Sequence, residues 1–183
     1  MDFPTDPMAN AGLKYHASKI LAHRATLDWV NEHHPHFTVI TLHPSFVFGR
    51  NLTQTSADTL DGSNSLLWTS LFSEKPTIPM SAVDVRDVAA AHLKALDSHV
   101  EKGAGVAEFL LSAPEAVGWA WDRVVSFVRG KYPNLDIKLV GPFDELQLAE
   151  TERAEKLLGI RWRSMEDTVS SFLDQQVELR AKA

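Results

Sequence analysis

The chain has 183 residues, a formal net charge of -6 and no cysteine. This length fits one domain of about 100–200 residues, and 44% hydrophobic residues supply a core, which excludes intrinsic disorder. The lack of cysteine excludes a disulfide scaffold or an Fe–S cluster, and the negative charge argues against a nucleic-acid partner. Neither a signal peptide nor an apolar run of about 18 residues, the length of a membrane span, is present. We therefore expect a cytoplasmic globular protein without a membrane partner.

Helices and strands are predicted to alternate along the chain. Apolar residues three and four apart predict a helix over about 9–32, which Pro35 ends. A short run of β-branched and aromatic residues predicts a buried strand at 37–42. The same patterns then predict a helix at 65–73, a strand at 83–85, a helix at 86–99, a strand at 107–111, a helix at 119–129, a strand at 136–140 and helices at 150–158 and 165–181. Such alternation indicates an α/β protein with at least partly parallel strands.

Tyr15 and Lys19 are the first candidates for chemistry. They are four residues apart on the first predicted helix, so they share one face and lie one turn apart. An ammonium group beside a phenol stabilises the phenolate and lowers the pKa of the phenol from its usual value near 10. A tyrosine in that setting can act as a general acid or base near neutral pH. By itself the spacing is more typical of a plain surface pair on a helix than of a catalytic pair.

The context of this pair strengthens the chemical interpretation. The helix reads Tyr-His-Ala-Ser-Lys-Ile-Leu-Ala at 15–22, the following strand ends Leu-His-Pro-Ser-Phe-Val-Phe-Gly at 42–49, and Val-Asp-Val-Arg-Asp-Val-Ala-Ala-Ala-His stands at 83–92. These three motifs, in this order, resemble the extended short-chain dehydrogenase/reductase superfamily, also called the NAD-dependent epimerase/dehydratase superfamily. The resemblance is greatest to the branch of dihydroflavonol reductases and fungal aldehyde or ketone reductases, and it covers essentially all 183 residues.

The resemblance implies a role for each matching residue. Tyr15 matches the catalytic tyrosine, which protonates the carbonyl oxygen as hydride arrives from the nicotinamide. Lys19 matches the lysine that hydrogen-bonds the nicotinamide ribose, so both residues also contact the cofactor. Pro44 and Val47 match the segment whose backbone meets the nicotinamide carboxamide.

The loop after that segment supplies the remaining candidates. Ser63 resembles a cofactor-contacting serine of the fungal reductases, and Ser65 fits after a small shift of register. Asn64 is expected near the substrate. Asp87 suits the start of a helix, where a carboxylate is favourable, and so is predicted to position structure rather than react.

No metal site is predicted. His33, His34 and His36 surround Pro35, but no His-Glu-x-x-His motif or suitably spaced carboxylate completes a ligand set. These histidines are interpreted as surface residues at a helix end, where cations are favourable.

The resemblance also implies a fold, from which one part is absent. The chain is predicted to form the C-terminal portion of a Rossmann-type doubly wound parallel sheet, plus a small substrate-binding α/β region. About 1–60 and 81–100 would be the Rossmann part, and about 61–80 and 101–183 the substrate-binding part. None of the nine glycines forms the Gly-x-x-Gly-x-x-Gly turn that holds the pyrophosphate, and no serine precedes Ser18 to match the family's catalytic serine.

Because the Gly-rich cofactor turn and the catalytic serine are absent, the chain is predicted not to be active on its own. The family favours NADP, with NAD possible, and a small aldehyde, ketone or dihydroflavonol-like carbonyl as substrate. Without the missing strands, the strand at 37–42 would have an unpaired apolar edge, which predicts self-association or a partner chain that supplies the missing half. We keep two alternatives: a non-catalytic remnant or interaction module, and a fragment of a sugar-nucleotide epimerase or dehydratase.

Overall fold

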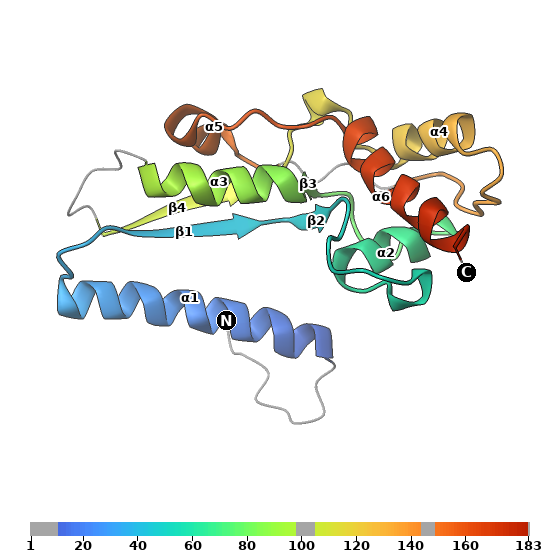
Figure 1. Ribbon diagram of the computed structural model, residues 1–183. Coiled ribbons are helices and arrows are strands. Elements are labelled where there is room, and N and C mark those ends of the chain that lie inside the picture. Colours follow the sequence, from blue (N-terminus) through green and yellow to red (C-terminus); the bar gives the residue numbers. More distant parts are fainter. Residues whose placement is uncertain (1–10, 98–104, 144–148, 183) are drawn as a thin grey trace. The chain divides into compact units, whose positions relative to one another are not determined.

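The computed structural model describes residues 11–97, 105–143 and 149–182 (Figure 1). Its elements, in chain order, are α1 (Ala11–His33), β1 (Val39–Pro44), β2 (Phe46–Phe48), η1 (Ala57–Thr59), α2 (Gly62–Leu71), β3 (Ala82–Asp84), α3 (Val85–Asp97), β4 (Val106–Leu111), η2 (Glu115–Val117), α4 (Trp121–Lys131), α5 (Glu152–Leu158) and α6 (Met165–Arg180). Two compact units can be distinguished, one of Met1–Thr41 with His99–Glu108 and one of Leu42–Ser98 with Phe109–Ala183.

In the first unit, the long helix α1 leaves much of its apolar surface exposed. Val30 is its one buried residue within the described part of the chain. Leu21 is 50% exposed and Trp29 43% exposed. His23 on this helix pairs with Glu108 of β4 through Nε2 and Oε1, 2.6 Å apart. No helix within the described ranges has both the length and the apolar character needed to cross a bilayer.

The strands confirm the predicted α/β class with parallel pairing. β1 pairs with β4, and β2 pairs with β3. The β2–β3 pair is parallel, with Phe46 opposite Ala82 and Phe48 opposite Asp84. Both of these short strands therefore end at the same edge of the second unit. Loops that follow the carboxyl ends of parallel strands are the usual place for a ligand site in α/β proteins.

Helices α2, α4 and α6 supply most of the core of the second unit. Aromatic rings pack within this core: Phe48 of β2 packs on Trp119, just before α4, with ring centres 5.7 Å apart, and Trp68 of α2 contacts Phe172 of α6 edge-on at 6.3 Å. The fully buried residues of this core include Phe48, Leu67, Leu71, Trp119, Val124, Val128, Leu139, Met165, Val169, Phe172 and Leu173. Met165, Val169, Phe172 and Leu173 of the last helix thus face inward, as their spacing indicated, whereas Val177 is exposed.

The predicted strand at 136–140 is wrong. Ile137 and Leu139 are buried, which explains the alternating pattern in the sequence. The backbone is held by a helix end instead of a neighbouring strand, because the N–H groups of Lys138 and Leu139 both donate to the carbonyl oxygen of Leu71, at 2.9 and 3.1 Å. The terminal carbonyls of a helix lack partners within the helix, and here an extended segment satisfies one of them.

The other predicted elements agree with the structure to within a few residues. The second predicted helix begins earlier than expected, at Gly62 rather than at 65, which brings Ser63 and Asn64 into its first turn. The predicted first helix began at 9 and the third ended at 99, positions that lie outside the described residues. The division into a Rossmann part and a substrate-binding part remains a prediction.

Candidate functional site

Tyr15 and Lys19 lie on one face of α1, in the first unit. The Lys19 Nζ atom is 5.3 Å from the centre of the Tyr15 ring, so the ammonium group lies over the aromatic face. The Ser18 hydroxyl donates to the Tyr15 carbonyl oxygen at 2.7 Å, within the helix backbone. Tyr15 is 59% exposed. The structure thus places the Tyr15 ring and the Lys19 ammonium group side by side, as their spacing predicts.

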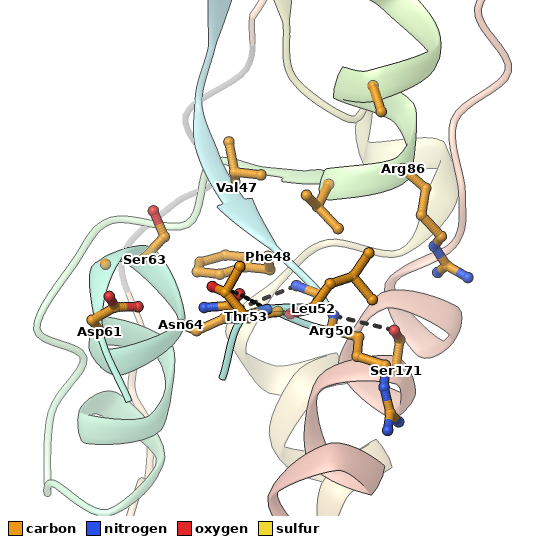
Figure 2. Close-up of a pocket in the computed structure, with 15 residues that line it drawn as sticks. Val47, Phe48, Arg50, Leu52, Thr53, Asp61, Ser63, Asn64, Arg86 and Ser171 are labelled. Atoms are coloured by element: carbon orange, nitrogen blue, oxygen red, sulfur yellow. Dashed lines mark hydrogen bonds between the residues drawn. The ribbon is translucent and has the colours of Figure 1, made fainter. Parts of the chain in front are cut away.

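A pocket of about 730 Å³ lies in the second unit, beyond the carboxyl ends of β2 and β3 (Figure 2). It is open and is formed by the end of β2, the loop that follows, the start of α2 and the start of α3. Its lining residues are Val47, Phe48, Gly49, Arg50, Asn51, Leu52, Thr53, Asp61, Gly62, Ser63, Asn64, Val85, Arg86, Ala89 and Ser171. A volume of this size is within the range of small-molecule sites.

Three of the predicted cofactor and substrate residues meet in this pocket. Val47, Ser63 and Asn64 all line it, although Val47 comes from β2 and the other two from α2. Pro44 ends β1 on an exposed position and is not part of the lining that the described residues form. Ser65, the alternative to Ser63, donates its hydroxyl proton to the carbonyl oxygen of Gly62 at 2.7 Å. Between the two serines, the pocket therefore favours Ser63.

Asn64 makes a reciprocal pair of hydrogen bonds with Gly49. Its Oδ1 accepts from the Gly49 N–H at 3.2 Å, and its Nδ2 donates to the Gly49 carbonyl at 2.7 Å. Gly49 has a φ of 131°, and a Cβ atom there would lie 3.0 Å from Val85 Cγ1. Only glycine fits this turn without strain. The two hydrogen bonds from the Asn64 side chain hold the backbone at the end of β2 in this conformation.

The loop after Gly49 contributes pocket residues that the sequence analysis did not identify. The sequence patterns predict no role for these residues, whereas Arg50, Asn51, Leu52 and Thr53 form one wall of the pocket. A signal for its anchoring was present in the tail. The last helix carries two adjacent glutamines, at 175 and 176. Gln176 follows Phe172 and Leu173 by four and three positions, which places it on the apolar side of the helix, and buried amides need partners.

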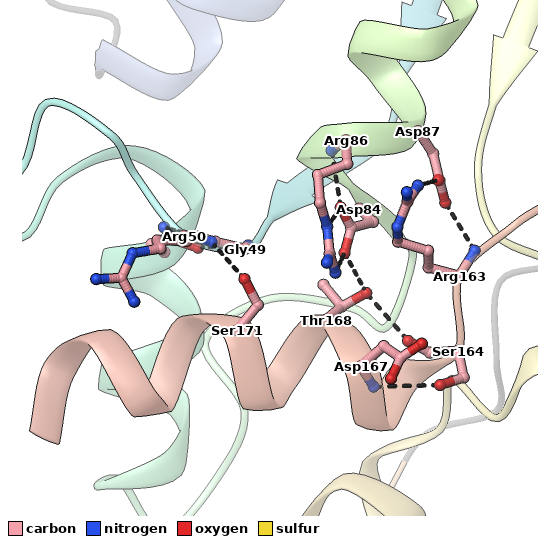
Figure 3. A network of polar contacts seen from close by, with 11 residues as sticks. Gly49, Arg50, Asp84, Arg86, Asp87, Arg163, Ser164, Asp167, Thr168 and Ser171 are labelled. Carbon is pink, nitrogen blue, oxygen red and sulfur yellow. Dashed lines mark hydrogen bonds and ion pairs between the residues drawn. The ribbon is translucent and has the colours of Figure 1, made fainter.

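Two buried aspartates connect the start of α3 to the C-terminal segment (Figure 3). Asp84 Oδ1 accepts from the Arg86 backbone N–H and Nε, at 2.7 and 2.9 Å, and its Oδ2 accepts from Arg86 Nη2 and the Thr168 hydroxyl, at 2.7 and 2.8 Å. Asp87 accepts from the backbone N–H of Arg163 at 2.8 Å and pairs with its guanidinium group. Asp87 thus lies in the first turn of α3, where the sequence analysis expected a structural carboxylate.

The Asp84 carboxylate remains charged despite its burial. Burial by itself acts to raise the pKa of this carboxyl, but the hydrogen bonds from Arg86 and Thr168 and the positive charge of Arg86 outweigh it, and the pKa lies below its ordinary value. The network therefore stabilises the corner between β3 and α3, from which Val85 and Arg86 reach the pocket.

The sequence is similar to those of fungal ketoreductases. It is 35% identical over 178 residues to the ketoreductase sphI of Aspergillus fumigatus, covering 94% of this chain and 52% of that protein. It is 30% identical over 188 residues to the ketoreductase CTB6 of Cercospora nicotianae, covering 96% and 52% of the two chains. This chain therefore spans about half the length of the curated relatives that it matches. No family model matches it.

Solved structures of the same superfamily share the fold. The yeast methylglyoxal/isovaleraldehyde reductase Gre2, solved with NADPH, superposes with a TM-score of 0.74 at 21% identity, over 98% of this chain and 56% of that one. A UDP-glucose 4-epimerase from Bifidobacterium longum superposes with a TM-score of 0.61 at 18% identity, over 96% and 57%. With the similarity to the ketoreductases, this fold confirms the resemblance that the three motifs indicated. The chain belongs to the extended short-chain dehydrogenase/reductase superfamily, in its fungal ketoreductase branch.

Proposed function

We propose that this chain carries the proton-donating and substrate-facing part of an NADPH-dependent carbonyl reductase. The observation that carries the proposal is the Tyr15–Lys19 pair, with the ammonium group 5.3 Å from the ring centre on one face of α1. The similarity to proteins named as ketoreductases, at up to 35% identity in the matches described above, supports the same reaction class. The substrate would be a small aldehyde or ketone.

In this reaction Tyr15 acts as the general acid. Its hydroxyl proton goes to the carbonyl oxygen, so that the product is an alcohol and Tyr15 is left as a phenolate. The Lys19 ammonium group stabilises that phenolate by its charge. NADPH, when bound, supplies the hydride that adds to the carbonyl carbon. Positioned proton transfer of this kind accelerates a reaction by about 100- to 10,000-fold.

The pocket in the second unit fits one end of such a cofactor or a small carbonyl substrate. Its apolar part includes Val47 and Leu52, and its polar part includes Ser63, a combination typical of small-molecule sites. We assign Val47 and Ser63, together with Pro44 and Lys19, to the nicotinamide end, and the region of Asn64 to the substrate. NAD remains the alternative cofactor, because no residue assigned here reads the 2′-phosphate.

The pyrophosphate of the cofactor needs a different segment. The sequence contains no Gly-x-x-Gly-x-x-Gly turn, the feature that opens a helix N-terminus to a phosphate in dinucleotide-binding folds. We therefore assign that function to polypeptide outside residues 1–183. A partner chain or the remainder of a longer protein could supply it equally well.

Calorimetric titration of the purified chain tests the assignment of Lys19. We expect NADPH and reduced nicotinamide mononucleotide, which lacks the adenylate half, to bind with similar affinity, because only the nicotinamide end is assigned to this chain. Lys19→Ala should weaken both by about ten- to a hundredfold, because a hydrogen bond from a charged group is worth about 1.5–3 kcal/mol. Lys75→Ala removes the same charge from an exposed loop and should leave the affinity unchanged.

Two results would contradict this proposal. Equal affinity of the Lys19→Ala variant would remove Lys19 from the cofactor site. No binding of either nucleotide at millimolar concentration would mean that the polypeptide has no cofactor site of its own. The second candidate function, an interaction module without catalysis, would then be the better description.

The exposed apolar surface of α1 favours the interaction module as the second candidate. It also predicts self-association of the chain, whether or not the chain is catalytic. Leu21 and Ile20 are 50% and 40% exposed on this helix, and apolar patches on a protein surface mark interaction sites. We expect the sedimentation coefficient to rise with concentration in analytical ultracentrifugation. The double variant Ile20→Lys/Leu21→Lys should sediment as a monomer, whereas Leu96→Lys, at an exposed position of α3, should behave like the unsubstituted chain. If the unsubstituted chain is a monomer that melts cooperatively above about 60 °C, this expectation is wrong.

A further inference from the structure

We infer that Gln175 and Gln176 of α6 are positioning residues that hold the loop 50–54 as a fixed wall of the pocket and so set its affinity for substrate. That a substrate binds in this pocket rests on the proposed function. The contacts between α6 and the loop, which support the positioning role, do not depend on it. Neither glutamine lines the pocket formed by the described residues. Both act through the loop.

Each glutamine makes a reciprocal pair of hydrogen bonds with the loop. Gln175 Oε1 accepts from the Asn51 N–H at 2.9 Å, and Gln175 Nε2 donates to the Asn51 carbonyl at 2.7 Å. Gln176 Nε2 donates to Gln54 Oε1 at 3.0 Å, and Gln54 Nε2 donates back to Gln176 Oε1 at 3.2 Å. The first pair uses the backbone of Asn51 as an adjacent strand would, so the helix replaces a sheet partner for this loop.

Neighbouring residues of α6 extend these contacts along the same side of the helix. The Ser171 hydroxyl accepts from the Arg50 N–H at 3.2 Å. Glu178 accepts from both guanidinium nitrogens of Arg50, at 3.2 and 2.5 Å. Residues 171, 175 and 178 are spaced four and three apart, which places them on one face. The loop is therefore bound over about two turns of the helix.

Burial makes these contacts costly to break. Gln175 is 3% exposed, Gln176 0% and Gln54 8%. A movement of the loop away from α6 would leave several buried donors and acceptors without partners, which is unfavourable. The loop is consequently preorganised. Near its tip, Leu52 is 90% exposed and lines the pocket (Figure 2), so an apolar side chain lies where a ligand can cover it.

Preorganisation of a binding wall predicts a specific kinetic signature. A loop that must be ordered on binding weakens the affinity for the ligand, whereas proton transfer at Tyr15 does not involve the loop. A variant that frees the loop should therefore raise KM and leave kcat within about twofold.

Amide hydrogen exchange tests the positioning role without any turnover. In Gln175→Leu we expect the exchange rate of peptides that cover 50–54 to rise by at least about tenfold, since a lost hydrogen bond of about 1.4 kcal/mol changes an equilibrium tenfold. Gln175→Glu keeps an acceptor for the Asn51 N–H and should give a smaller rise in exchange rate. This variant provides the test if Gln175→Leu does not fold. Val177→Ala, at an exposed position between Gln176 and Glu178, is the matched control and should exchange like the unsubstituted chain.

The steady-state assay completes the test with methylglyoxal and isovaleraldehyde as probes. A tenfold rise of KM in Gln175→Leu with kcat unchanged supports the inference. Unchanged exchange of the loop, or a fall of kcat at constant KM, overturns it. A chain that neither binds NADPH nor reduces either probe, but whose loop exchanges faster in Gln175→Leu, would overturn the proposed function and retain the positioning role.

Discussion

Replacement of Tyr15 by phenylalanine is expected to lower kcat for carbonyl reduction by about 100- to 10,000-fold, the contribution of a positioned general acid. The variant keeps the ring that lies under Lys19 Nζ and removes only the hydroxyl. Because Tyr15 is 59% exposed, loss of its hydroxyl should have little effect on the folded state. Consumption of NADPH with methylglyoxal or isovaleraldehyde, under conditions in which the unsubstituted chain is active, measures the effect.

Tyr132, the second tyrosine of the chain, provides the matched control. Its hydroxyl donates to Asp174 Oδ1 at 2.7 Å, between α4 and α6. Tyr132→Phe removes that hydrogen bond, so we expect a loss of about 1 kcal/mol of stability and an unchanged kcat. NADPH affinity should stay the same in Tyr15→Phe, because Lys19 is assigned to the ribose. A Tyr15→Phe variant with more than about a tenth of the original kcat would exclude Tyr15 as the proton donor.

Replacement of Arg86 by methionine is expected to destabilise the fold by about 2–3 kcal/mol at pH 7. The Asp84 side chain has no exposed surface, and Arg86 donates three of the hydrogen bonds that it accepts, two of them from the guanidinium group. Removal of one partner of a buried ion pair costs about 3–5 kcal/mol. The value expected here is lower because the Arg86 side chain is 45% exposed, and solvent screens the pair.

The stability lost in Arg86→Met should become smaller as the pH falls. In the unsubstituted chain the pKa of Asp84 lies below its ordinary value, so its contribution is full above about pH 4 and is lost as the pH falls through the folded-state pKa. In Arg86→Met burial dominates and raises the pKa of Asp84. As the pH falls, protonation of Asp84 therefore removes the cost of burying an unpaired charge in the variant. The difference in urea midpoint between the two proteins should therefore shrink from pH 7 to pH 4.

An exposed pair gives the comparison for this prediction. Arg50 pairs with Glu178 at 2.5 Å, with both side chains nearly half exposed. Arg50→Met should change the urea midpoint much less than Arg86→Met and without the same dependence on pH, because exposed ion pairs contribute little. Equal effects of the two substitutions would mean that the burial of Asp84 is not what makes its ion pair important.

The local elements of this protein follow from its sequence. The spacing of apolar residues gave α1, α3, α4 and α6 to within a few residues, because helix periodicity depends on neighbours three and four positions away. The same spacing brought Tyr15 and Lys19 to one face of α1. The three motifs around these residues also identified the superfamily, which the similarity to the ketoreductases confirmed.

The predicted strand at 136–140 failed for a reason that local pattern cannot supply. Alternation of buried Ile137 and Leu139 is common to strands and to any extended segment that packs with one face inward. A strand also needs a neighbour with free backbone groups, and here that neighbour is the end of α2, through the carbonyl of Leu71. Pairing depends on residues about 65 positions apart, so only the tertiary structure decides it.

For the pocket, too, the sequence determines some features and the tertiary structure others. The sequence by itself determined the candidate residues Val47, Ser63 and Asn64 and the alternation that makes the fold α/β. Tertiary structure decided that these three meet in one pocket, that Asn64 holds the backbone of Gly49, and that α6 fixes the loop 50–54 through glutamines more than 120 positions away. The physical reason is that periodicity records which side chains are buried, whereas a hydrogen bond between distant segments depends on where folding brings each donor and acceptor.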